Sequence, residues 1–143
     1  MDACAELAAL AGRVGAEASS PRDFLLTLGT EAAGIRRGPL WMLDAALAGR
    51  NRLPGRGFAP PFDDGSNGQA RHFAGTAVSA ARLGASVTRW VSVRLRRDPL
   101  DSADGRLGEK AITFAGLVLT GELPVSDTPG WIAENLCGEH PPA

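Results

Sequence analysis

His72 is the residue of this sequence best suited to acid–base chemistry. The chain contains only two histidines, and the other, His140, lies close to the C-terminus. An imidazole titrates near neutral pH, so a histidine beside a carboxylate can act as a general base. Asp63 and Asp64 precede His72 at the end of a segment rich in Gly, Pro and Asp. In that role, Asp63 or Asp64 would orient the imidazole. The alternative is a histidine that only bonds a neighbouring helix or fixes the loop.

A second acidic cluster lies further along the chain and comprises Asp98, Asp101, Asp104 and Glu109. Numbering Asp98 as position 1 places Glu109 at position 12, as in an EF-hand, but the turn glycine that a calcium loop needs is missing. Helix capping explains most of the cluster. Asp101 or Ser102 can accept a backbone N–H, and Asp104 belongs to the positive first turn of a helix.

The two groups define one candidate site. His72 and the acids fall in the first turns of two predicted helices, so they converge if the helices pack with their starts together. As an enzyme, the protein would use the catalytic candidates His72, Asp101 and Asp104. The candidate ligand-binding residues come from the preceding loop and the start of the helix that follows it: Phe58, Phe62, Asp63, Asp64, Asn67 and Arg71.

Several other chemistries find no support in the sequence. Two cysteines and two histidines are too scattered to supply four zinc ligands, so we expect no metal site. Gly55-Arg56-Gly57 lacks the flanking strand and helix of a phosphate-binding loop. No Gly-x-Ser-x-Gly nucleophile motif is present. We therefore expect no cofactor.

The cysteines and the first residues bear on the cellular compartment. Cys4 and Cys137 lie near opposite ends of the chain, and acids stand where a secretory signal would carry basic residues. Isolated cysteines in such a chain are typically free thiols, so we expect free thiols and a cytoplasmic location. A disulfide joining the ends is the alternative. No apolar run reaches the roughly 18 residues of a membrane span, so we expect no membrane partner.

Apolar periodicity and helix punctuation predict an all-α fold. The expected helices span 2–18, 21–33, 39–48, 67–83, 85–97, 102–120 and 128 to about 136. They predict a compact orthogonal bundle of six or seven short helices, with helices 67–83 and 102–120 at its centre. One long irregular loop covers about 50–67. We expect a single domain over 1–137 and a flexible tail over 138–143. Segment 85–97 also has a strand-like alternation, but no other strand is available to pair with it.

The same patterns predict which large side chains are buried. We expect Phe73, Phe114 and Trp90 in the core, where truncation to alanine costs about 3–5 kcal/mol. The third helix is expected to bury the four apolar residues Leu40, Trp41, Leu43 and Leu47.

One resemblance covers roughly residues 63–121. The string from Asn67 to His72, followed by the string from Asp101 to Asp104 and by Leu107-Gly108, is similar to small helical bacterial domains. In those domains an Arg-His pair on one helix faces a Ser-x-x-Asp and a Gly on another, and some occur in toxin-like or phage-associated proteins. The resemblance implies that these two helices pair, and it implies no particular reaction.

Two function classes remain, and a third is less favoured. The first is a helical module that binds a protein partner or a small apolar ligand. The second is a small hydrolase-like or toxin-like enzyme that uses His72. A carboxylate bonded to His72 within reach of solvent would favour the enzyme, and a His72 bonded only to backbone would favour the module. Nucleic-acid binding through arginine clusters is the third, disfavoured by a net charge of −1 and a pI of about 6.1.

Overall fold

Seven α-helices make up the described part of the chain, which covers residues 2–47, 49–95, 99 and 101–138 of this computed structural model. They are α1 (Ala3–Glu17), α2 (Pro21–Ala33), α3 (Trp41–Ala46), α4 (Gln69–Leu83), α5 (Ala85–Trp90), α6 (Ala103–Thr120) and α7 (Thr128–Asn135). Shorter turns are the 3₁₀ turns η1 (Pro60–Phe62) and η3 (Val125–Asp127), and the π-helical turn η2 (Val91–Leu95), which continues α5. No strand occurs in these residues, so the all-α prediction and the helical choice for the segment after Gly84 are confirmed.

Side-chain caps fix the ends of several helices as the sequence predicts. Ser20 Oγ accepts the backbone N–H of Asp23 at 3.0 Å and begins α2. Ser102 Oγ accepts the N–H of Gly105 at 3.0 Å and begins α6. Gly34 ends α2 with a φ of 66°, a left-handed conformation that glycine adopts without strain. These bonds satisfy backbone groups that a helix end leaves without a partner.

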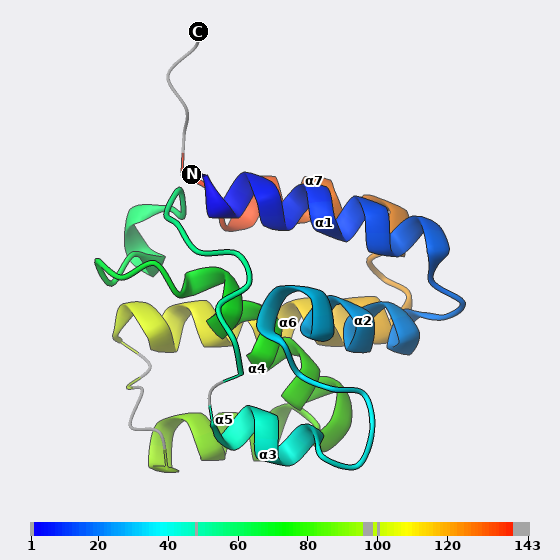
Figure 1. Ribbon diagram of the computed structural model, residues 1–143. Helices are drawn as coiled ribbons and strands as arrows, with labels where there is room; N and C mark the ends of the chain where they lie inside the picture. Colours follow the sequence, from blue (N-terminus) through cyan, green and yellow to red (C-terminus); the bar gives the residue numbers. More distant parts are fainter. Residues whose placement is uncertain (1, 48, 96–98, 100, 139–143) are drawn as a thin grey trace, which may run out of the picture.

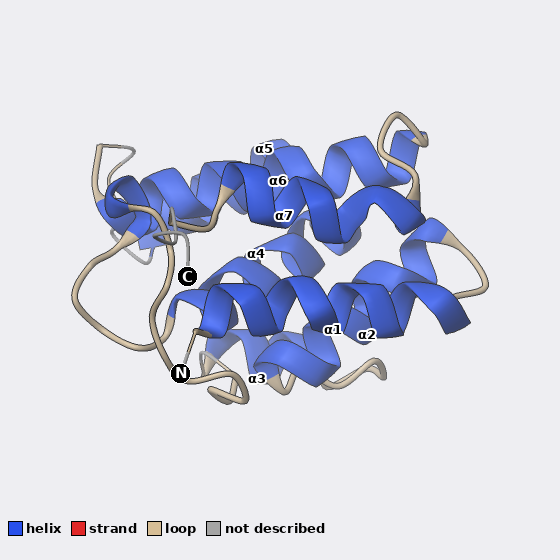
Figure 2. Ribbon diagram, turned by 90° about the horizontal axis from the view of Figure 1, so that it is seen from above, coloured by secondary structure: helices blue, strands red, loops and turns tan. Residues whose placement is uncertain are grey.

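The core is centred on α4, which packs most extensively against α6 and α2. Seen from above, α4 lies between these two helices (Figure 2). Phe114 of α6 lies 5.2 Å from Phe73 of α4, 6.3 Å from Phe24 and 5.0 Å from Trp131, measured between ring centroids. Phe73 and Phe114 are fully buried, which confirms both predictions.

The helices α3 and α5 lie at the end of the molecule opposite α1 and α7 (Figure 1). Here the burial predictions are wrong, because Leu40, Leu43 and Leu47 are 50%, 50% and 71% exposed and Trp90 is 56% exposed. α3 contacts the bundle chiefly through the half-buried Trp41 and contains no buried residue. No described element packs over the outer sides of α3 and α5, and this explains the exposure.

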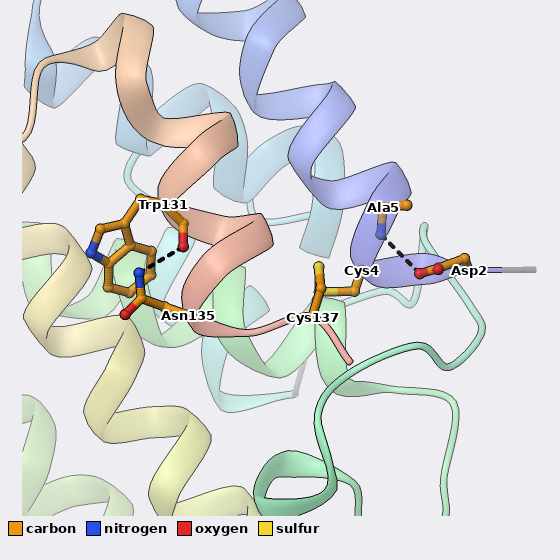
Figure 3. The surroundings of a disulfide bond; sticks show 6 residues. All are labelled: Asp2, Cys4, Ala5, Trp131, Asn135 and Cys137. Atoms are coloured by element: carbon orange, nitrogen blue, oxygen red, sulfur yellow. Dashed lines mark hydrogen bonds between the residues drawn. A yellow bond between two sulfur atoms is a disulfide. The ribbon is translucent and has the colours of Figure 1, made fainter. Parts of the chain in front are cut away.

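A disulfide joins the two ends of the described chain. Cys4, in the first turn of α1, is bonded to Cys137, which follows α7, across a sequence separation of 133 (Figure 3). Because α1 packs antiparallel on α7, the beginning of one helix meets the end of the other. The expectation of free thiols is therefore wrong. Free thiols therefore no longer support the cytoplasmic expectation, since disulfides persist mainly in oxidising compartments.

The long loop before α4 is tied to both ends of the chain. The Arg56 carbonyl accepts the N–H of Ala3 at 2.7 Å, and the N–H of Ala59 donates to the Leu136 carbonyl at 2.8 Å. Phe58 and Phe62 are 5% and 7% exposed and belong to the hydrophobic core. This part of the loop therefore forms a strap across the junction of α1 and α7.

Some predictions fall outside the described residues. Tail residues 139–143, with His140, lie there, and so does Asp98. Across the residues that the structure describes, no helix has both the length and the apolar character needed to cross a bilayer.

Candidate functional site

A cavity of about 550 Å³ lies between α3, α4, α5 with η2, and the start of α6. Its apolar lining comes mainly from α2, α3 and the end of α4: Ala33, Ile35, Trp41, Met42, Ala45, Ala46 and Leu83. Its polar lining comes from the end of the long loop and from α4, α5, η2 and α6: Asp64, Ser66, Arg71, His72, Thr76, Ser79, Thr88, Ser92 and Asp104. One cavity thus has an apolar wall and a polar wall.

His72 lies at the polar side, where α4 meets the start of α6. Its Nε2 atom lies 2.9 Å from the backbone carbonyl oxygen of Asp104. A carbonyl only accepts, so Nε2 donates in this bond, and Nδ1 is the nitrogen left to face other partners. The imidazole packs closely on α6, since a Cβ atom added at Gly108 would lie in van der Waals contact with Nε2, at 3.5 Å. The predicted meeting of the two helix starts is confirmed, through the backbone of Asp104 rather than its carboxylate.

Asp64 and Asp104 both line the polar side of the cavity, and their side chains interact. Asp64 also accepts the N–H of Ser66 at 2.8 Å and its hydroxyl at 2.6 Å. Burial raises the pKa of Asp64, but the hydrogen bonds from Ser66 and Asp104 outweigh it and hold that pKa below its ordinary value.

Hydroxyl groups form the wall beyond His72. Ser79 Oγ is satisfied, since it donates to the carbonyl of Gly75 at 3.0 Å. Thr88 is only 4% exposed, yet its Oγ1 atom has no hydrogen-bond partner among the described residues. A buried hydroxyl without a partner costs about 1–3 kcal/mol. A polar group of a bound molecule would restore that bond.

Several predicted site residues lie away from the cavity. Asp63 pairs with Arg56 and accepts the N–H of Gly65 at 2.9 Å, so it holds the loop. The carbonyl of Asn67 accepts from Gly55 and from the Asn51 side chain. Asp101 is exposed, and its carbonyl accepts from Arg106. Phe58 and Phe62 lie in the core. None of these five predicted residues lines the cavity.

Arg71, by contrast, is a predicted residue that does line the cavity, and it makes no ion pair with another described residue. The sequence interpretation missed Trp41 and Met42 of α3 and the hydroxyls of Thr88 and Ser92 as lining residues. A signal for the hydroxyls existed, because residues four apart share one face of a helix.

The polar side offers acceptors and acids rather than a metal centre. Among residues the structure describes, no three His, Cys, Asp or Glu side chains are grouped as metal ligands. The imidazole of His72 and the carboxylates of Asp64 and Asp104 can accept hydrogen bonds from a bound molecule. Neither a protein-family model, nor a curated protein, nor a solved structure matches the chain.

Proposed function

We propose that this chain is a helical module that binds a small, largely apolar molecule in the cavity between α3, α4 and α5. The observation that carries the proposal is the cavity of about 550 Å³ with an apolar wall and a polar wall. This volume is in the range of small-molecule sites, which are mostly apolar with a few placed polar groups. The buried Thr88 hydroxyl without a partner supports a ligand that carries at least one polar group.

The environment of His72 also favours binding over catalysis. Its observed hydrogen bond goes to the backbone carbonyl of Asp104, and this bond ties α4 to α6. A general base is usually oriented by a carboxylate that stabilises its protonated form. A histidine held by a carbonyl keeps a defined tautomer and presents Nδ1 as an acceptor, which suits recognition of a ligand's N–H or O–H.

The test uses N-phenyl-1-naphthylamine, a neutral dye whose fluorescence rises in apolar surroundings. We expect saturable binding at one site. Ala45→Phe places a ring against the cavity and should weaken binding about tenfold or more, which corresponds to about 1.4 kcal/mol. The matched control is Ala9→Phe, at an exposed alanine of α1. Equal dye affinity in both variants, or no saturable binding to the native chain, would rule out this cavity as the site.

A second substitution tests the polar wall. Thr88→Val keeps the volume of the side chain and removes the buried hydroxyl. We expect the unliganded protein to become more stable, by about 1 kcal/mol, because the unsatisfied group is gone. A ligand that uses this hydroxyl should bind the variant less tightly. Reduced stability in urea unfolding would show that the hydroxyl already has a partner.

The second candidate function is a small hydrolase-like enzyme. The observation in its favour is that the carboxylates of Asp64 and Asp104 line the same cavity wall as the imidazole of His72. In this mechanism Nδ1 would take a proton from the attacking water, and the resulting imidazolium would return that proton to the leaving group.

His72→Gln separates the two functions. The glutamine amide can still donate to the Asp104 carbonyl, but it cannot act as a base. An enzyme should lose about 10²–10⁴-fold in hydrolysis of p-nitrophenyl esters, with an unchanged circular dichroism spectrum. Hydrolysis by the native chain at the rate of buffer alone would remove this candidate for ester substrates and leave the binding module.

A further inference from the structure

The exposed apolar side chains of this protein are gathered at one end. Eight large hydrophobic residues are exposed among those described, and seven belong to α3, α5 and their immediate flanks: Leu40, Met42, Leu43, Leu47, Leu83, Val87 and Trp90. We call these seven residues the α3–α5 face. Scattered exposed apolar residues are normal on a soluble protein, but a gathered set marks an interaction surface.

The face is continuous with the cavity. Met42 and Leu83 both line the cavity and are 60% and 37% exposed. α3 and α5 both contribute to the cavity lining, and both lie at the same end of the molecule (Figure 1). In α5 the hydroxyl of Thr88 is buried while Val87 and Trp90 are exposed. This orientation is the reverse of that expected for a helix whose outer side meets only water.

Arginines flank the helices of this face along the sequence. Arg36 and Arg37 precede α3, Arg50 and Arg52 follow it, and Arg82, Arg89 and Arg94 lie along α4, α5 and η2. The sequence between Asp64 and Asp98 contains no acidic residue, and the sequence between Glu31 and Asp63 contains only Asp44. Asp44 is paired with Arg36.

Three of these arginines are exposed and form no ion pair with a described residue: Arg50, Arg52 and Arg94. Arg50 is near enough to Asp44 for its charge to lower the pKa of that carboxyl group. The net charge of −1 does not reveal this surface, because most of the acidic residues lie elsewhere in the chain. The end of the molecule that exposes its apolar side chains therefore also presents arginines without an ion pair, while the carboxylates of Asp64 and Asp104 lie inside the adjoining cavity.

From this combination we infer that the α3–α5 face docks on the surface of an anionic phospholipid bilayer. Apolar side chains beside arginines match the boundary between acyl chains and charged headgroups. Trp90 suits this boundary, since tryptophan is enriched where an apolar region meets water. A nucleic acid would satisfy the arginines but leave the leucines without an apolar partner. The proposal concerns the surface and does not depend on what the cavity holds.

The first experiment measures co-sedimentation of the full chain with vesicles. One set contains phosphatidylcholine alone, and the other contains phosphatidylcholine with phosphatidylglycerol. We expect binding to the anionic vesicles and much weaker binding to the neutral ones, with the difference reduced by salt. Equal binding to both, or binding to neither, would overturn the proposal.

Two pairs of variants identify the surface. Leu43→Glu with Leu47→Glu should abolish vesicle binding, whereas Leu119→Glu, at an exposed leucine outside the face, should not. Arg50→Ala with Arg52→Ala should weaken binding to anionic vesicles about thirtyfold, because each arginine near such a surface contributes about fivefold. The control is Arg13→Ala with Arg22→Ala, two exposed arginines of α1 and α2. The arginine pair keeps the test informative if the leucine variant does not fold.

A fluorescence measurement locates the contact. Tryptophan emission should shift to shorter wavelength on anionic vesicles, and Trp90→Phe should remove most of the shift. If Trp90→Phe leaves the shift unchanged, another surface makes the contact. Tighter binding to a DNA duplex than to vesicles, unaffected by Leu43→Glu with Leu47→Glu, would assign the arginines to nucleic acid and contradict the proposal.

Discussion

The helix α6 and the pair α3 and α5 all carry large apolar residues, but α6 buries them and α3 and α5 expose most of theirs. Leu107 and Phe114 of α6 are fully buried against α4 and its neighbours. In α3 and α5, Leu43 and Trp90 are half or more exposed, while the hydroxyl of Thr88 is buried. One region therefore uses its apolar surface to stabilise the fold, and the other leaves that surface available to a partner.

The difference means that one region provides most of the folding stability and another region forms the candidate site. Burial of apolar side chains provides most of the driving force for folding, so α6 and α4 carry much of the stability. The region of α3 and α5 adds little burial and encloses a cavity with an unsatisfied hydroxyl. Regions that bind ligands are often drawn from the less stable parts of a protein.

The largest expected effect contrasts one aromatic residue from each region. Phe114→Ala should lower the free energy of unfolding by about 3–5 kcal/mol, because it leaves a void among three aromatic rings. Trp90→Ala should change it by only about 0.5 kcal/mol, since its side chain is mostly in solvent. Urea unfolding of both variants measures the contrast. Similar losses in the two variants would show that α5 is as well packed as α6.

The disulfide is expected to act on the same stable region. Replacing both Cys4 and Cys137 by alanine should lower the free energy of unfolding by about 2–4 kcal/mol, because the bond closes nearly the whole chain into a loop. Dye binding in the cavity should be unchanged at temperatures where the variant is folded, since the bond lies by α1 and α7 and does not line the cavity. Two reactive thiols in the native protein would contradict the bond itself.

Sequence patterns were sufficient for the helices and for the core. Ser20 and Ser102 cap their helices as predicted, and apolar spacing identified Phe73 and Phe114 as buried. The same spacing failed for Leu43 and Trp90, because periodicity defines an apolar side of a helix but not whether another element covers it. The disulfide was also missed, since the approach of two chain ends depends on how α1 and α7 pack.

The site was predicted only in part for a similar reason. His72 and Asp104 both fall in the first turns of their predicted helices. These positions predicted that His72 meets the start of α6. The loop aromatics Phe58 and Phe62 were expected at a ligand and lie instead in the core. Phe58 is bridged to Cys137, and Phe62 belongs to the turn η1, which packs on α6. The part of the cavity wall that α3 supplies could not be predicted from the sequence. It depends on how α3 is turned, with Leu43 and Leu47 exposed and Trp41 lining the cavity.

A smaller effect concerns the start of α6, where the two regions meet. Ser102→Ala should lower the free energy of unfolding by about 0.5–2 kcal/mol, because the N–H of Gly105 loses its acceptor. Ser20→Ala is the matched control, since it removes an equivalent cap from α2. Both losses should be similar in urea unfolding. Only Ser102→Ala should also alter dye binding, since it loosens the turn that presents Asp104 to the cavity. Equal dye affinity in the two variants would show that the turn is held by other contacts.

The smallest expected effect is an acid-dependent loosening of α3. The side chain and the backbone N–H of Arg36 donate to Asp44 at 2.9 Å and lower the pKa of Asp44 to about 2, from an ordinary value of 3.8. Because the folded pKa is the lower one, the stabilisation is complete above about pH 4 and is lost as the pH falls toward 2. Trp41, at the start of the same helix, should report the change through its fluorescence. Asp44→Asn should remove this acid transition, whereas Glu134→Gln, at an exposed residue of α7, should leave it in place. A transition that persists in Asp44→Asn would mean that other groups hold α3 to the bundle. The difference in packing between α3 and the core would then be smaller than the exposure of the α3 leucines indicates.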